Sequence, residues 1–83
     1  MSEASGTEFT EEIRQGLTSD GSEVVEDIVT AVDPQTGDEL VDDLIVSVAP
    51  DGSTTIDETI AVVDGGTGAG EIIEEAVVEI DPT

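Results

Sequence analysis

The sequence predicts a mainly β fold, an antiparallel meander of four strands that forms an open sheet, a small barrel or a sandwich, with a short helix before it. Two observations predict the strands. Four copies of a short pattern are dense in Val, Ile and Thr, which favour strands over helices, and turn sequences rich in Pro, Asp and Gly separate the copies. A small all-α bundle is the alternative, because the order apolar-apolar-acid-acid-apolar-apolar also fits one face of a helix.

The helix is predicted over residues 9–17, within the segment TEFTEEIRQGL. Phe9, Ile13 and Leu17 recur at every fourth position and would form one apolar stripe. Two glutamates stand in the first turn, where the helix dipole favours negative charge. We expect this helix to cover part of one face of the sheet.

The four strand copies occupy about residues 22–33, 38–49, 53–64 and 71–81, and they read GSEVVEDIVTAV, GDELVDDLIVSV, GSTTIDETIAVV and AGEIIEEAVVEI. The segments between them, DPQTG, APDG and DGGTGAG, are typical of hairpin connections. Gly37, Gly52, Gly65 and Gly66 are the candidates for positive φ in these turns.

Both faces of such strands are rich in apolar side chains, because successive residues point to opposite sides. The repeat pattern predicts that Ile45 and Ile60 share one face, and that Leu44 and Val46 share the other. A meander with one solvated face would alternate more cleanly. We therefore expect a second copy of the chain, or a larger protein assembly, to cover a face. The predicted interaction residues are Phe9, Ile13, Leu44, Ile45, Ile60 and Val77.

A pair of acidic residues interrupts the middle of each copy. The four pairs are Glu26-Asp27, Asp42-Asp43, Asp57-Glu58 and Glu74-Glu75. A continuous strand would place one carboxylate of each pair on each face, and burying an unpaired carboxylate is costly. Either the strand bulges there, or the sheet is hydrated at its middle.

The charge balance is the most unusual property of the chain. Its 83 residues include 22 Asp and Glu against a single basic residue, Arg14, and give a formal net charge of −21. Such a balance together with 36% hydrophobic residues is typical of folded proteins of salt-in halophilic archaea and their viruses. At about 1 M salt the Debye length is roughly 3 Å, so surface carboxylates no longer repel one another over long distances.

The residue inventory argues against an enzyme. The chain has no His, Cys or Lys and no Tyr, so the usual bases, nucleophiles and soft metal ligands are missing. Nucleic acid is not expected as a direct ligand, because phosphate contacts need Lys or Arg. No apolar run approaches the length of a membrane span. We expect residues 1–8 to form a flexible arm and residues 9–83 one small domain, located in the cytoplasm of a high-salt organism or in a virion.

Two loops contain candidate ligand residues. Asp33, Asp38 and Glu39 lie in the turn DPQTGDE and could place oxygen ligands around a hard cation, but a hairpin turn flanked by charged residues is the favoured interpretation. The glycine-rich run at residues 65–70 lacks the lysine of a phosphate-binding loop, and we interpret it as a connection. No cofactor is expected beyond non-specific K⁺, Na⁺, Mg²⁺ or Ca²⁺.

The sequence therefore favours a non-enzymatic, halophile-adapted structural or assembly protein. A small virion component of the decoration or tail type, or a small subunit of a complex, has these properties. Two alternatives remain open: an acidic inhibitor that mimics DNA and occupies a DNA-binding protein, and a module that binds divalent cations weakly.

Overall fold

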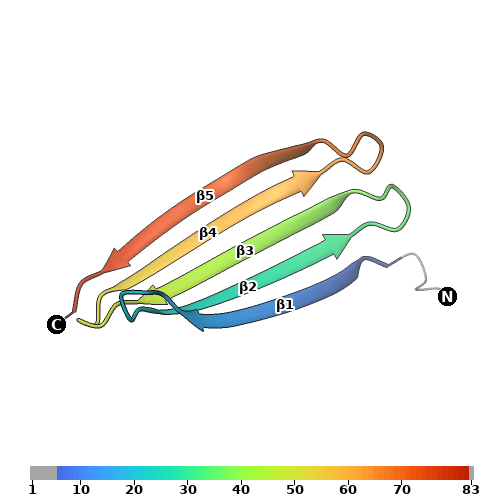
Figure 1. The fold of residues 1–83 in the computed structure, drawn as a ribbon. Helices are drawn as coiled ribbons and strands as arrows, with labels where there is room; N and C mark the ends of the chain where they lie inside the picture. The colour runs from blue at the N-terminus through green and yellow to red at the C-terminus, as the bar shows by residue number, and fades with distance from the viewer. Residues whose placement is uncertain (1–5, 83) are drawn as a thin grey trace.

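The computed structural model describes residues 6–82, which form one five-stranded sheet (Figure 1). Each strand pairs antiparallel with the next, so the order across the sheet follows the order along the chain. The strands are β1 (Glu8–Leu17), β2 (Glu23–Val32), β3 (Glu39–Val48), β4 (Thr54–Val63) and β5 (Gly70–Ile80). The mainly β prediction and the antiparallel meander are confirmed, in the form of an open sheet.

The predicted N-terminal helix is wrong, because residues 9–17 lie in a fifth strand. β1 pairs with β2 along its whole length, from Glu8 opposite Val32 to Leu17 opposite Glu23. A spacing of four residues also returns a side chain to the same side of a strand, so the stripe did not distinguish helix from strand. The expected arm ends where β1 begins, and its residues 1–5 lie outside the described residues.

β1 belongs to the repeat, whose period is two strands. Glu8, Phe9 and Ile13 correspond to Glu39, Leu40 and Leu44 of β3, each pair 31 positions apart. The turns repeat at the same distance. Residues 18–22 (TSDGS) match 49–53 (APDGS), and residues 33–37 (DPQTG) match 64–68 (DGGTG). The repeating unit is therefore a β-hairpin with its two turns.

The two kinds of turn lie at opposite ends of the sheet (Figure 1). In the DGS turns (residues 18–22 and 49–53), Gly21 and Gly52 have φ values of 90° and 92° and donate to the carbonyls of Thr18 and Ala49. In the DxxTG turns (residues 33–38 and 64–69), Gly37 and Gly68 have positive φ. Of the four glycines predicted to have positive φ, only Gly37 and Gly52 do, because Gly65 and Gly66 precede the left-handed position.

The sheet is a single layer without a closed core. Strands contact only their neighbours in the order, and none of the described apolar residues is buried. Side chains of β1 and β5 are exposed throughout, whereas most of those on the three central strands are half-buried. The radius of gyration is 16.3 Å, against about 12 Å for a compact chain of this length.

The strand register divides the side chains between two unlike faces, because residues directly opposite each other point to the same side. All three leucines lie on one face, named here the leucine face, and four of the five strand threonines lie on the other, the threonine face. The leucine face has sixteen apolar residues: Phe9, Ile13, Leu17, Val25, Val29, Ala31, Leu40, Leu44, Val46, Val48, Ile56, Ile60, Val62, Ala76, Val78 and Ile80. The threonine face has nine: Val24, Ile28, Val32, Val41, Ile45, Ala61, Val63, Ile72 and Val77.

This register corrects the predicted grouping of the faces. Ile60 lies opposite Asp42 in β3, so it shares the leucine face with Leu44 and Val46 rather than a face with Ile45. The register breaks once, between β4 and β5, where Ile60 pairs with Glu74 and Ala61 pairs with Ile72. Ile73 is the additional residue of this bulge.

Candidate functional site

Each acidic pair in the strands is divided between the two faces. The leucine-face belt consists of one acid from every strand: Glu11, Asp27, Asp42, Glu58 and Glu74. The threonine-face belt consists of Glu12, Glu26, Asp43, Asp57 and Glu75. The pairing of β2 with β3 and of β3 with β4 passes through the belts without a bulge, so the bulge alternative does not describe these strands. Only β5 is irregular next to its acidic pair.

Neighbouring carboxyl groups of the belts interact across the strands. On the leucine face, hydrogen bonding to Asp27 raises the pKa of Glu11, and hydrogen bonding to Asp42 raises the pKa of Glu58. On the threonine face, hydrogen bonding to Asp43 raises the pKa of Glu26. A proton shared between two carboxyl groups removes their mutual repulsion, which is why the protonated form is favoured.

The aspartate of each interacting pair has an oxygen that is shielded from solvent. Oδ1 of Asp27, of Asp42 and of Asp43 has no hydrogen-bond partner within the chain. An ionised carboxylate can only accept hydrogen bonds. The belts therefore present acceptors for which the described part of the chain provides few donors.

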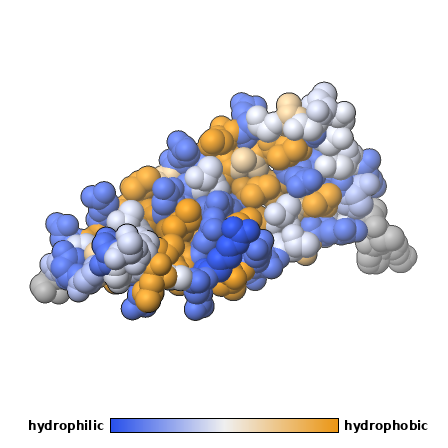
Figure 2. All heavy atoms as spheres, viewed as in Figure 1, coloured by the Kyte–Doolittle hydropathy of each residue, from blue (hydrophilic) through white to orange (hydrophobic). Residues whose placement is uncertain are grey.

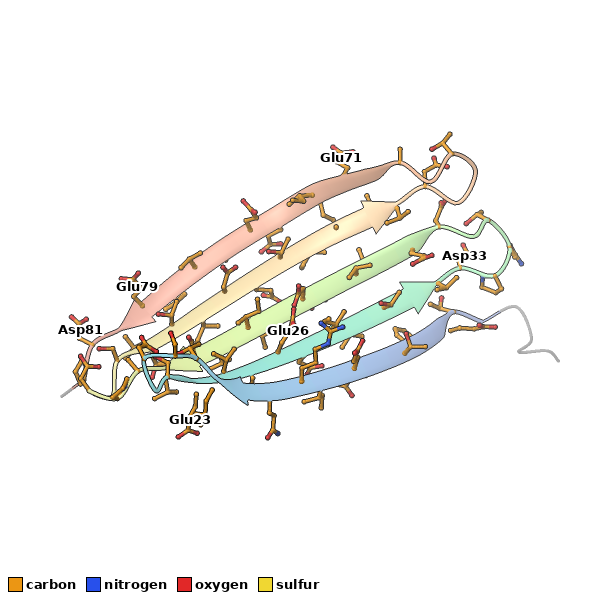
Figure 3. All side chains as sticks on the ribbon, in the orientation of Figure 1. Glu23, Glu26, Asp33, Glu71, Glu79 and Asp81 are labelled. Atoms are coloured by element: carbon orange, nitrogen blue, oxygen red, sulfur yellow. The ribbon has the colours of Figure 1, made fainter. Side chains whose placement is uncertain are left out.

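Arg14 is the only basic side chain, and it lies on the threonine face. Its Nε donates to Oε2 of Glu12 over 2.9 Å, and one terminal nitrogen lies 3.8 Å from Oε1 of Glu26. These carboxylates raise the pKa of Arg14, with the hydrogen bond to Glu12 as the main cause. Glu26 lies at mid-length of the sheet (Figure 3). Arg14 thus offsets part of one belt and none of the other.

Exposed apolar side chains gather on the leucine face. Eleven large apolar residues of the described chain are exposed, and the register places eight of them there. These eight are Phe9, Ile13, Leu17, Val25, Leu40, Val48, Val78 and Ile80. Phe9 is 70% exposed and Leu17 is 74% exposed. Hydrophilic and hydrophobic side chains are interleaved over the side of the molecule that Figure 2 shows.

The predicted interaction residues are divided by the register. Phe9, Ile13, Leu44 and Ile60 lie on the leucine face, whereas Ile45 and Val77 lie on the threonine face. Sequence reasoning did not find the carboxyl pairs across strands, because they depend on the register. Val25, Val46 and Ile56 form an apolar row beside the leucine-face belt, and of these only Val46 was grouped correctly with Leu44 from the sequence.

The predicted cation ligands line a depression of about 640 Å³ beside the DxxTG turns. Oδ1 of Asp33 accepts the N–H of Gln35 over 2.9 Å, and Oδ1 of Asp38 accepts the N–H of Gly65 over 2.8 Å. Glu39 is half-buried at the start of β3. Within residues 6–82, no three acidic side chains converge closely enough to hold a metal ion. The glycine-rich run forms the second DxxTG turn, in which Oδ1 of Asp64 accepts the N–H of Gly66.

No family model, no curated protein and no solved structure matches this chain. Across residues 6–82 there is no helix long and apolar enough to cross a membrane.

Proposed function

We propose that this protein is a non-enzymatic structural or assembly module adapted to high salt, acting as a small virion component or as a small subunit of a complex. The observation that carries the proposal is the single-layer sheet, in which no described apolar residue is buried. Soluble monomers rarely expose contiguous apolar patches larger than a few hundred Å². Such a sheet gains stability when another protein surface covers it.

The composition supports the same proposal. A net charge of −21 keeps the free protein hydrated and dispersed, while the apolar side chains on the two faces provide the area that an interface needs. Self-association into a homo-oligomer and docking on a larger assembly would both bury these side chains. Neither requires a catalytic side chain.

The acidic DNA mimic is the second candidate, and one observation favours it. Each belt sets one carboxyl group on every strand, alternating between two adjacent rows across the five strands, so that it presents a line of negative charges as a phosphate backbone does. In that role the protein would bind basic DNA-binding proteins through charge alone.

Sedimentation in 2 M KCl tests the proposed assembly function. We expect wild type to form a complex with itself or to sediment with a larger assembly. Leu44→Asp should weaken a complex formed through the leucine face, and Ile45→Asp should weaken one formed through the threonine face. A wild-type monomer that recruits no other protein in molar salt would contradict the assembly function.

A further inference from the structure

We propose that the leucine face is the docking surface for a cationic amphipathic helix of another protein, which places one Lys or Arg per turn on the carboxyl belt and aliphatic side chains on both sides of it. This inference rests on the proposed assembly function, and it states the partner's chemistry for one of the two faces.

The leucine face has the area of a stable interface. Ten-residue strands are about 34 Å long, and five strands side by side span about 24 Å. Their product, about 800 Å², equals what each partner buries in a protein–protein interface of standard size. A helix of about 16 residues crosses this width, and the protein that carries the helix can cover the remaining rows.

The negative charge of the leucine-face belt determines which kind of partner can bind this face. A second copy of this chain would set the same five carboxyl groups against the belt, and like charges facing one another disfavour a complex. The only cation of the chain, Arg14, is on the opposite face and contacts Glu12 and Glu26. Nucleic acids and anionic membranes carry the same sign as the belt. A partner with Lys or Arg at the centre of its contact surface is complementary to it.

Hydrogen bonding points to the same chemistry. The belt contains Oδ1 of Asp27 and Oδ1 of Asp42, both shielded from solvent and without a partner in the chain. Hydrogen bonding to these aspartates, together with their charge, raises the pKa values of the neighbouring Glu11 and Glu58. Ammonium and guanidinium groups are positively charged and supply only donors, so they can donate to the exposed carboxyl groups of Glu11 and Glu74 and offset the negative charge of the belt.

The spacing of the belt fits a helix that crosses the strands. Its acids alternate between two adjacent rows of the face, so consecutive acids are displaced by one strand spacing, about 4.8 Å, across the strands and by two residues, about 6.8 Å, along them. A helix advances about 5.4 Å per turn, and side chains at i, i+3 or i+4, and i+7 follow its contact face. Ile13, Val29, Leu44 and Ile60 occupy the positions between the acids. Aliphatic side chains of the helix can pack there.

Binding of a synthetic helix tests the inference. The probe is an 18-residue amphipathic peptide with Lys once per turn bordered by Leu, and its control carries Glu in place of each Lys. Fluorescence anisotropy measures binding in 0.2 M and 1 M KCl. The variant pair is Asp42→Asn with Glu58→Gln on the leucine face, and Asp43→Asn with Asp57→Asn on the threonine face. Both double variants change the net charge equally in the same two strands.

We expect the wild type to bind the Lys peptide and not the Glu peptide. The leucine-face double variant should weaken binding at least tenfold, and the threonine-face double variant less than threefold. Leu44→Thr should weaken binding more than Ile45→Thr, because only Leu44 lies beside this belt. Since each variant removes repulsion or keeps strand propensity, circular dichroism should show that all of them fold.

Three results would overturn the inference. Equal losses in the two double variants would mean diffuse charge attraction, as expected of a DNA mimic. No peptide binding, together with self-association that Leu44→Asp abolishes, would assign the leucine face to a second copy and leave the assembly function intact. No peptide binding and no association of any kind would contradict both proposals.

Discussion

The backbone N–H of Gly65 donates a hydrogen bond of 2.8 Å to Oδ1 of Asp38, across 27 positions of sequence. This bond joins the two DxxTG turns, and with them the β2–β3 hairpin to the β4–β5 hairpin. The backbones approach so closely that a Cβ atom on Gly65 would contact the carbonyl oxygen of Thr36 and lie 2.7 Å from the Cα of Gly37. Glycine is therefore required there for space.

Gly65→Ala should destabilise the sheet by about 1–3 kcal/mol, the range for overpacking against atoms that cannot easily move. Urea denaturation in 2 M KCl measures the loss. Gly16→Ala is the control, because no atom lies within 4 Å of a Cβ at that position. If the two variants were equally stable, the turns would not be in contact in solution.

Gly52→Val should cost about 1–2 kcal/mol through the left-handed backbone that the DGS turn requires. Gly52 has a φ of 92°, which a β-branched residue adopts only with strain. Gly70→Val is the matched control, since φ there is not left-handed and the nearest atoms to an added Cβ lie 3.9 Å away. Thermal unfolding of both variants in molar salt compares them, and an unchanged midpoint for Gly52→Val would exclude this turn geometry.

The error in β1 shows how much of the fold the sequence could predict. Strand content and turn positions followed from Val, Ile, Thr and Gly, which act locally. Phe9, Ile13 and Leu17 did not distinguish helix from strand, because a spacing of four residues keeps side chains on one side of either element. The signal that could have decided was the match of residues 8–17 to residues 39–48, visible only when the repeat is taken as a hairpin of two strands.

The division of the faces could not be read from single strands. Between β2 and β3, even-numbered residues share a face with odd-numbered ones, as with Asp27 opposite Leu44. Between β3 and β4, odd residues share a face with odd ones, as with Ile45 opposite Asp57. Turn length sets this relation. The acidic pairs were predictable from sequence, but the partners of their carboxyl groups were not.

Stability should be greatest in mildly acidic solution. The pKa values of Glu11, Glu26 and Glu58 are raised above 4.5 by hydrogen bonding to neighbouring carboxyl groups. Because the folded state binds these protons more tightly, their stabilisation is present below pH 4.5 and lost as pH rises through the raised values. Asp20 and Asp51 have pKa values lowered from 3.8, through hydrogen bonds from Thr18 and Ser53 respectively. Their stabilisation is lost as pH falls through the lowered values.

We expect the stability of the sheet to be greatest near the interval between pH 3.8 and pH 4.5. This interval extends upward because the pKa values of the three glutamates are raised. Denaturation midpoints from pH 3 to pH 7 in 2 M KCl would reveal it. Glu58→Gln should reduce the loss of stability above the maximum, because its amide donates to Asp42 at every pH. A wild-type midpoint that rises steadily to pH 7 would show that the belt carboxyl groups do not share protons.

Folding should depend on salt, because the sheet has no closed core to oppose its own repulsion. Both belts set acidic side chains at diagonal positions on adjacent strands, within reach of one another's charge, and only Arg14, on the threonine face, offsets any of this charge. At about 2 M KCl the Debye length is below roughly 3 Å, so repulsion beyond direct contact is screened. Circular dichroism should show the strand signal growing between 10 mM buffer and 2 M KCl.

The double variant Asp42→Asn with Glu58→Gln should reach half of its signal at lower salt than wild type, since it removes one pair of crowded carboxyl groups. A fully formed, salt-insensitive strand spectrum in 10 mM buffer would mean that the sheet tolerates its charge, and the halophilic interpretation of the composition would fail.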